Sequence, residues 1–340
     1  MRAKKGASVW LPSSDTSSVE KRTLLYFICG NPGLIEYYRD FLTHLRHLLD
    51  TANSSGTAYD IYGCNLPGFS DSDHEKPFSA ENPPWNLPGV MGKMYEDVKT
   101  RGEGYGEVIL MGHSVGTFIA VEMFHRYLRE DAGGVKLRHG FLLFPTVTHI
   151  ALSPNGKRFT FLMRWLPLLE KYAHIPARMI LSLVPYMLLE GFISNILGFA
   201  PSAAKTTAGW LKSRDGVYQT LYLASDEMKV IAGEERWGSE IWEVEDAPST
   251  KMSGGESGGK AGLPRFFMLY GKKDHWVDEN LRDDFVGRMG RLRGEGRRVP
   301  RIEVDGKGLR HDFCTMEDSS FEVAEKVNAW VAEIEAAKRR

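Results

Sequence analysis

The amino-acid sequence predicts an α/β fold built on one mostly parallel sheet, and two patterns lead to this prediction. First, short apolar runs alternate with amphipathic helical patterns, and such alternation produces βαβ crossovers between parallel strands. Second, the alternation stops over residues 147–262 and then resumes, so one insertion interrupts one sheet. The expected strands lie at residues 23–29, 58–64, 107–114, 139–146, 265–274 and 301–307.

The first part of the core is expected over residues 22–146, after an N-terminal segment of residues 1–21. Its first strand ends at the tight loop Gly30-Asn31-Pro32-Gly33, and apolar residues then recur at helical spacing over 38–49. The second strand leads into a Pro-Gly loop. The third is followed by a helix over residues 115–129, which has apolar residues on one side.

The second part of the core is expected over residues 263–340. A Ser/Gly-rich stretch at 248–262 precedes it and has the composition of a disordered surface loop. The basic stretch 291–301 is expected to be a solvated surface loop. The closing helix is marked by apolar residues at helical spacing, which are Ala324, Val327, Val331 and Ile334.

Composition and charge exclude several classes of protein. With 42% apolar and 26% charged residues over 340 positions, the chain is globular rather than disordered or fibrous. A formal net charge of -1 gives no global attraction to nucleic acid or to an anionic membrane. We therefore expect no nucleic-acid partner, and any membrane contact should be apolar and local.

The cysteines and the N-terminus indicate the compartment. Cys29, Cys64 and Cys314 are odd in number and lack C-x-x-C spacing, which argues against disulfides or a zinc site and favours a reducing environment. The first residues are basic but lack the apolar core of a secretory signal. We expect the protein on the cytosolic side of membranes.

Ser114 is the first candidate catalytic residue. It lies in the stretch GHSVG, residues 112–116, between the third strand and its helix. A serine hydroxyl is a weak nucleophile unless a base accepts its proton and donors stabilise the oxyanion that develops. A sharp strand-to-helix turn exposes such a serine, and the elbow glycines Gly112 and Gly116 relieve the crowding there. The structural alternative is that Ser114 only caps the helix.

The partners of such a serine follow in the chain order serine, acid, histidine, each after a later strand. Asp274 follows the penultimate strand and His311 follows the last one. Asp278 and Asp312 compete for the role of the acid, although Asp312 adjoins the histidine and adjacent side chains seldom face each other. We predict a triad of Ser114, His311 and Asp274.

Two backbone N–H groups are expected to bind the oxyanion. Val115, the residue after the nucleophile, should supply one, and the loop after the first strand should supply the other. Pro32 has no N–H, so Asn31 is the better candidate within that loop. A purely structural Gly-Pro turn is the alternative interpretation of the loop. This chemistry requires no metal ion and no organic cofactor, and we predict neither.

The ordered set of serine, aspartate and histidine resembles that of the α/β-hydrolase fold. More narrowly, ICGNPGLIEYYRDFL together with GHSVG resembles the lipid droplet-associated serine hydrolase family, over about residues 22–335. The resemblance is specific at these two motifs and vague through the insertion. It implies an α/β-hydrolase core with Ser114, Asp274 and His311 as its triad, and it places the protein at the lipid droplet surface, with the endoplasmic reticulum as the reservoir.

The insertion is expected to form an apolar helical cap. Residues 179–189 carry no charge, and a second uncharged run ends at Ala204. A helix that spans a bilayer needs about 20 consecutive apolar residues. Pro185 and Glu190 interrupt this segment, so we predict that it does not span a membrane.

Two interpretations of the cap remain open. Its helices line an acyl pocket, or residues 179–204 insert shallowly into a lipid monolayer, and the two roles are compatible. Trp165, Trp210 and Tyr186 are aromatic residues that suit an interface or a core equally. The leading functional hypothesis is a serine acyl hydrolase that acts on lipid esters through an acyl-enzyme. The alternative is a lipid-droplet binding or scaffold protein with little turnover.

Overall fold

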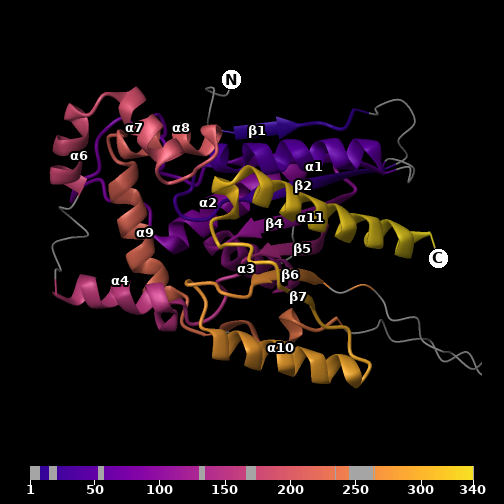
Figure 1. Cartoon of the computed structure of the whole chain (residues 1–340). Coiled ribbons are helices and arrows are strands. Elements are labelled where there is room, and N and C mark those ends of the chain that lie inside the picture. The colour runs from indigo at the N-terminus through magenta and orange to yellow at the C-terminus, as the bar shows by residue number, and fades with distance from the viewer. Residues whose placement is uncertain are drawn as a thin grey trace, which may run out of the picture.

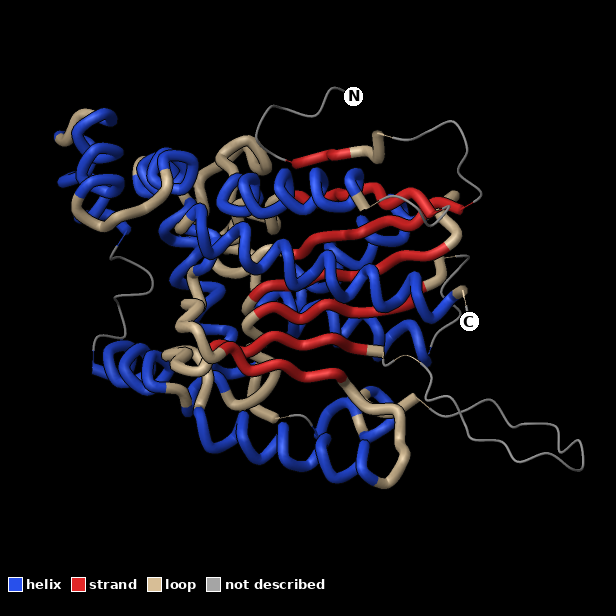
Figure 2. The backbone as a smooth tube through the Cα atoms, turned by 45° about the vertical axis from the view of Figure 1, so that its right-hand side comes forward, coloured by secondary structure: helices blue, strands red, loops and turns tan. Residues whose placement is uncertain are grey.

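A computed structural model describes residues 8–14, 21–52, 57–129, 135–165, 174–233, 235–244, 263 and 265–339. Over these residues, one seven-stranded sheet has the order β1-β3-β2-β4-β5-β6-β7 (Figures 1 and 2). β1 is antiparallel to β3, and every other neighbouring pair is parallel. The strands are β1 (Ser8–Leu11), β2 (Lys21–Ile28), β3 (Thr57–Cys64), β4 (Glu107–His113), β5 (Leu137–Leu143), β6 (Phe266–Gly271) and β7 (Arg301–Asp305).

The mostly parallel sheet is confirmed, but one strand was not predicted and another ends earlier than expected. β1 was not predicted, because this short edge strand buries only Val9 fully and leaves Trp10 half exposed. β5 ends at Leu143 rather than at residue 146, since Phe144 takes a left-handed backbone angle of φ 48° that cannot continue a strand. The Ser/Gly-rich stretch 248–262 lies outside the described residues.

Helices cover both faces of the sheet. In Figures 1 and 2, α1 and α11 lie side by side on one face, whereas α2 and α3 cover the other. Strands covered on both faces are apolar throughout, and β4 and β6 are buried along nearly their whole length. The helices are α1 (Arg39–Thr51), α2 (Leu87–Gly102), α3 (Val115–Arg129), α10 (Glu279–Gly294) and α11 (Glu317–Lys338).

The expectation of a surface loop over residues 291–301 is partly wrong. Residues 291–294 form the last turn of α10, and Arg301 begins β7. The basic side chains occupy the exposed side of that turn, so their charge alone did not show that the backbone is helical. Short 3₁₀ helices complete the core, at Ile35–Tyr38, Ile150–Leu152, Glu235–Trp237, Ser239–Ile241 and Phe313–Thr315.

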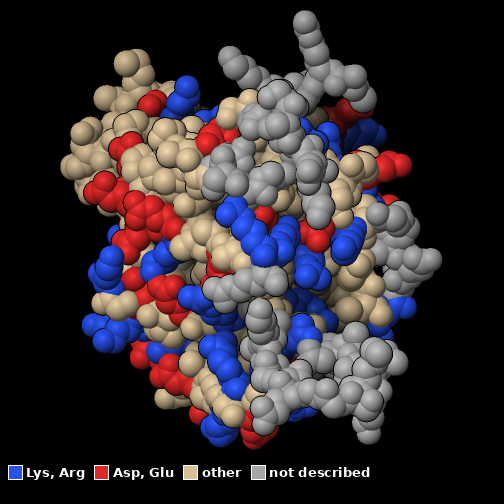
Figure 3. Space-filling model, turned by 90° about the vertical axis from the view of Figure 1, so that its right-hand side faces the viewer, with Lys and Arg blue, Asp and Glu red and all other residues tan. Residues whose placement is uncertain are grey.

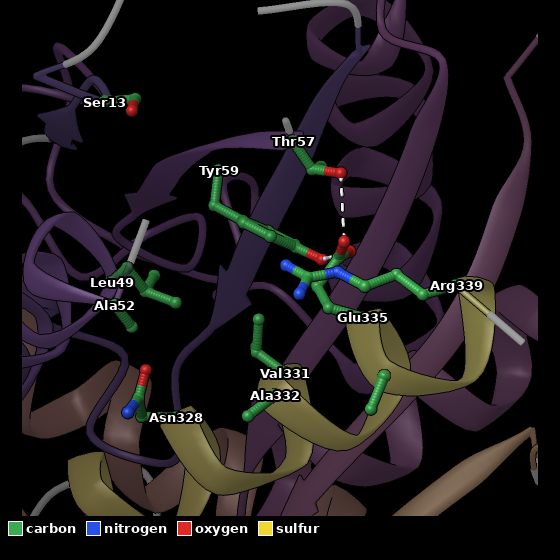
Figure 4. Close-up of a pocket in the computed structure, with 11 residues that line it drawn as sticks. Ser13, Leu49, Ala52, Thr57, Tyr59, Asn328, Val331, Ala332, Glu335 and Arg339 are labelled. Carbon is green, nitrogen blue, oxygen red and sulfur yellow. Dashed lines mark hydrogen bonds between the residues drawn. The ribbon is translucent and has the colours of Figure 1, made fainter. Parts of the chain in front are cut away.

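A buried carboxylate attaches the closing helix to the sheet. Glu335 of α11 accepts hydrogen bonds from Thr57 Oγ1, at 3.1 Å, and from the hydroxyl of Tyr59, both on β3. Figure 4 shows the three side chains pointing toward one another beside a small cavity. Lys338 Nζ lies 3.1 Å from the same carboxylate. A buried charge needs such partners, so these contacts fix the register of α11 against β3.

The predicted helical cap is confirmed between β5 and β6. It contains α4 (Pro154–Trp165), α6 (His174–Leu183), α7 (Tyr186–Asn195), α8 (Pro201–Leu211) and α9 (Gly216–Val230). α7 packs on α8 through Leu189, Ile193, Ala204 and Ala208. Among the described residues, no helix has the length and apolar character to cross a membrane.

The two ends of the molecule differ in chemistry. The cap lies at the carboxyl ends of the parallel strands, on the left of Figure 1. The opposite end, which faces the viewer in Figure 3, carries Lys and Arg side chains interspersed with Asp and Glu. Ion pairs at the amino ends of the strands belong to this charged end, including Lys136 with Glu107 at 3.5 Å and Lys338 with Glu107 at 3.1 Å.

Candidate active site

The strand order creates a crevice between β2 and β4. The chain leaves β2 toward β3 on one side and returns to β4 on the other, so the loops after β2 and β4 diverge. In open α/β sheets, ligands bind at such a switch point, at the carboxyl ends of the strands. The loop after β2 contains Asn31, and β4 ends directly before Ser114. The topology therefore brings two predicted site residues to one crevice.

Ser114 lies on a strained turn. Its backbone φ is 54°, which is uncommon for a residue with a side chain. A Cβ on Gly112 would lie 2.4 Å from the carbonyl oxygen of Gly116, and a Cβ on Gly116 would lie 2.3 Å from that of Ile28. Only glycine fits at either position, and this packing allows α3 to begin one residue after the serine.

The predicted triad residues lie in hydrogen-bond contact. His311 Nε2 is 2.9 Å from Ser114 Oγ, and His311 Nδ1 is 2.7 Å from Asp274 Oδ2. The carboxylate of Asp274 is buried and accepts a hydrogen bond from Trp276 N at 2.9 Å through its other oxygen. Because a carboxylate only accepts, Nδ1 of His311 carries the proton and Nε2 is free to accept from the serine hydroxyl.

The competing acids have other partners. Asp278 caps α10, where its Oδ1 accepts from Asn280 N and Leu281 N. Asp312 forms a two-bond ion pair with Arg310, at 2.8 and 2.9 Å. Neither carboxylate is hydrogen-bonded to His311 in the described structure, whereas Asp274 is.

A buried chain of hydrogen bonds, which the sequence analysis missed, links the loops that carry the site. His113 Nε2 lies 2.8 Å from the carbonyl oxygen of His311, His113 Nδ1 lies 2.8 Å from the hydroxyl of Tyr38, and that hydroxyl accepts from Gly30 N at 2.9 Å. A carbonyl only accepts, so Nε2 of His113 carries the proton. Burial, together with the nearby His311, lowers the pKa of His113 well below 6.5, so the ring is neutral and Nδ1 accepts from Tyr38.

These hydrogen bonds hold three parts of the site at fixed spacing: the loop after β2, the serine turn and the loop that carries His311. The signal in the sequence was the histidine inside GHSVG, but nothing local shows that its ring faces Tyr38. The contacts are made between residues that are 75 and 198 positions apart.

Val115 and Asn31, the residues predicted to supply the oxyanion donors, both lie near the serine. Val115 is the first residue of α3, and the first N–H groups of a helix have no partner within the helix. Asn31 lines the same cavity as Ser114 and His311. The four residues 30–33, here called the Asn31 loop, lie close to the serine, since a Cβ on Gly30 would lie 3.1 Å from Ser114 Cβ.

The cavity above Ser114 has a volume of about 410 Å³ and a largely apolar wall. The cap supplies much of that wall, through Phe159, Phe199, Trp210, Leu221 and Ala224. Of the three aromatic residues that suited an interface or a core, Trp210 faces the cavity. Trp165 is 68% exposed, and the hydroxyl of Tyr186 donates to the carbonyl of Lys205 at 2.8 Å. A cavity of this size and character suits an apolar group held against a nucleophile.

The sheet, the serine turn and the helical cap define an α/β-hydrolase. Solved structures agree on the fold: a haloalkane dehalogenase variant from Bradyrhizobium elkanii superposes with a TM-score of 0.55 at 15% identity, covering 99% of this chain and 97% of that one. An N-formylmaleamic acid deformylase variant from Pseudomonas putida gives 0.50 at 10% identity, with 94% of each chain covered.

The sequence profile described as lipid-droplet associated hydrolase matches residues 21–314, and the chain belongs to that family. The family resemblance stated from the two motifs is thereby confirmed. The lipid droplet-associated hydrolase of Gallus gallus is 28% identical over 328 residues, which cover 94% of this chain and 87% of the relative. That of Mus musculus is 25% identical over 338 residues, covering 95% and 89%.

Proposed function

We propose that this protein is a serine hydrolase that cleaves lipid esters through a covalent acyl-enzyme. The main support is the chain of contacts from Asp274 through His311 to Ser114, at 2.7 and 2.9 Å, beneath an apolar cavity. Such an array converts a weak nucleophile into a reactive one.

In the proposed reaction, His311 Nε2 takes the proton of Ser114 as Oγ bonds to the ester carbonyl carbon. The backbone N–H groups of Val115 and Asn31 bind the oxyanion, and the carboxylate of Asp274 stabilises the imidazolium. The carbon–oxygen bond to the alcohol then breaks, and His311 returns the proton to that leaving oxygen. Water repeats the sequence on the acyl-serine and releases the carboxylic acid, so atoms and protons balance without a cofactor.

The proposed substrate class rests on the cavity wall and on the family. Apart from Glu227, the wall residues contributed by the cap have no formal charge. Such a wall suits a fatty-acyl chain better than a charged acyl group. The relatives are named for lipid droplets. We therefore propose sterol esters, glycerolipids or related fatty-acyl esters as the substrate class.

A fluorophosphonate probe and a lipid-ester panel test this proposal. Ser114 Oγ should attack the probe's phosphorus and expel fluoride, so the wild type is labelled and Ser114→Ala is not. With lipid esters presented as an emulsion, only the wild type should release fatty acid. A folded wild type that neither labels nor hydrolyses any ester would contradict the proposal and favour the alternative of a lipid-binding scaffold.

We further propose that the cap docks the protein on a lipid monolayer. A surface on α6 and α7, here called the apolar cap surface, exposes Leu183 by 85% and Met187 by 83%, together with Met179, Ile180, Leu188 and Phe192. Exposed apolar patches of this kind mark sites of interaction with membranes or proteins. We propose that the apolar cap surface contacts the lipid droplet surface, which the protein reaches from the cytosolic face of the endoplasmic reticulum. The charged opposite end then faces water.

Charging the apolar cap surface is expected to release the protein from lipid. Leu183→Glu/Met187→Glu should weaken binding to a phosphatidylcholine-coated triolein emulsion by about 100-fold or more, since each buried side chain of this kind contributes about 1.5–3 kcal/mol. Flotation of the emulsion measures the bound fraction. The matched control Leu128→Glu/Val304→Glu charges exposed apolar residues outside the cap and should bind as the wild type does. Equal binding of all three proteins would refute the docking proposal.

A further inference from the structure

A buried carboxyl group in the cap has no role in the reaction described above. Glu227 of α9 is 4% exposed and lines the catalytic cavity. Thr220, Ala224 and Glu227 recur at helical spacing, and all three belong to the cavity wall. One face of α9 is therefore turned toward the site. A carboxyl at such a position is costly unless it is hydrogen-bonded, so its partner identifies what it does.

The partner of Glu227 is the side chain of Asn31. Asn31 Nδ2 donates to Glu227 Oε1 at 2.9 Å and to the backbone oxygen of Thr220 at 3.1 Å. Because the Thr220 carbonyl only accepts, the amide is oriented with its NH₂ group toward α9. Asn31 Oδ1 is buried and has no hydrogen-bond partner among the described residues, so Nδ2 makes the contacts that hold this side chain.

The contact joins parts of the chain that are 196 residues apart. One is the Asn31 loop, whose backbone N–H is the proposed second oxyanion donor. The other is the cap helix that covers the acyl cavity. An oxyanion donor works only when it is preorganised within tenths of an ångström, and nothing in the loop's own sequence fixes its distance from the cap.

We propose that Glu227 is a positioning residue, which couples the placement of the cap helix to the geometry of the Asn31 loop and so sets the activity of the site. This inference rests on the proposed function, in which the Asn31 loop binds the oxyanion. Movement of α9, as when the cap contacts a lipid surface, would then be transmitted to the loop through the Asn31–Glu227 contact.

The protonation state of Glu227 follows from its surroundings. Burial raises its pKa to about 8, and the nearby Asp226 acts in the same direction, against the hydrogen bond from Asn31. The other titratable groups on the cavity wall are Tyr37, Tyr38, His113, His311, Asp312 and Cys314. Below pH 8 the group is a neutral acid. The pKa of Glu227 is higher in the folded protein than its usual value of 4.5, so the protonated side chain favours the folded cap, and this stabilisation is lost as pH rises through about 8. Loss of the proton also places a negative charge beside the oxyanion site.

Three variants and one soluble fluorophosphonate probe test the coupling. Glu227→Ala should label about 10- to 100-fold more slowly than the wild type at pH 7, because the Asn31 loop loses its side-chain contact with α9. Glu227→Gln keeps an acceptor oxygen and should label within about threefold of the wild type. The matched control Asp226→Asn alters the neighbouring acid, which accepts from Leu87 N and not from Asn31, and should also label normally.

A double-mutant cycle and a pH profile separate positioning from a general structural role. Asn31→Ala keeps the backbone donor but removes the contact with Glu227, so Glu227→Ala should cost little more in that background. The labelling rate of the wild type should fall as pH rises through about 8, and Glu227→Gln should lack this fall. Additive effects of the two alanine variants, or an unchanged alkaline fall in Glu227→Gln, would overturn the proposal.

Amide hydrogen exchange tests the coupling without catalysis. In Glu227→Ala, the amides of Gly30, Asn31 and Gly33 should exchange faster than in the wild type and in Asp226→Asn. A wild type that fails to label would refute the proposed function, and the exchange rates would still decide whether Glu227 holds the loop. Unchanged exchange in Glu227→Ala would overturn the inference even if the enzyme is active.

Discussion

Replacing His311 with alanine is expected to slow the acylation of Ser114 by about 10³-fold or more, the scale found when members of such triads are removed. The imidazole Nε2 lies 2.9 Å from Ser114 Oγ, and among the described residues no other side chain is hydrogen-bonded to that oxygen. Without it, the serine proton passes only to water. The rate constant for labelling by a fluorophosphonate measures the effect directly.

Asp274→Asn should also slow the labelling of Ser114 by a fluorophosphonate. An asparagine that turns its NH₂ group toward Nδ1 favours the wrong tautomer of His311, in which Nε2 carries the proton and cannot accept from Ser114. The matched controls are His275→Ala and Asp278→Asn, because His275 is exposed and Asp278 caps α10. Both should label at nearly the wild-type rate. Normal labelling of His311→Ala would show that another group is the base.

The residues of the proposed triad were predictable because each has a local signal. Ser114 lies between glycines at a strand end, and Asp274 and His311 each follow a strand of a parallel sheet. In such a sheet the carboxyl ends of the strands meet at one edge, so chain order and strand position together bring distant side chains close. The strands themselves were found because buried parallel strands are continuously apolar.

What the sequence did not show depends on contacts between distant segments. The pairing of Asn31 with Glu227 crosses from the core to the cap, and a single glutamate in an amphipathic helix has no local sign of burial. The hydrogen bonds of His113 depend equally on where Tyr38 lies. The cap is similar: its apolar residues indicated a pocket or a lipid contact, but only packing shows that Phe199 faces the cavity while Leu183 faces outward.

Gly116→Ala is expected to destabilise the fold and to disable the site together. The added methyl would lie 2.3 Å from the Ile28 carbonyl oxygen and 2.6 Å from that of Cys29, and both contacts are with backbone at the end of β2, the strand beside β4. Neither can rotate away, so α3 must shift from β2. Overpacking of this kind costs about 1–3 kcal/mol.

The shift in Gly116→Ala also separates Ser114 from the Asn31 loop, since Cys29 leads directly into that loop. A displacement of about 1 Å between reacting groups costs on the order of 100-fold in rate. Thermal unfolding and probe labelling should therefore decline together. The control is Gly92→Ala in α2, where nothing lies within 4 Å of the added methyl and where alanine should stabilise the helix by up to about 1 kcal/mol. If Gly116→Ala melted and labelled like the wild type, the close packing of the serine turn against β2 would not be what holds Ser114 in its strained conformation.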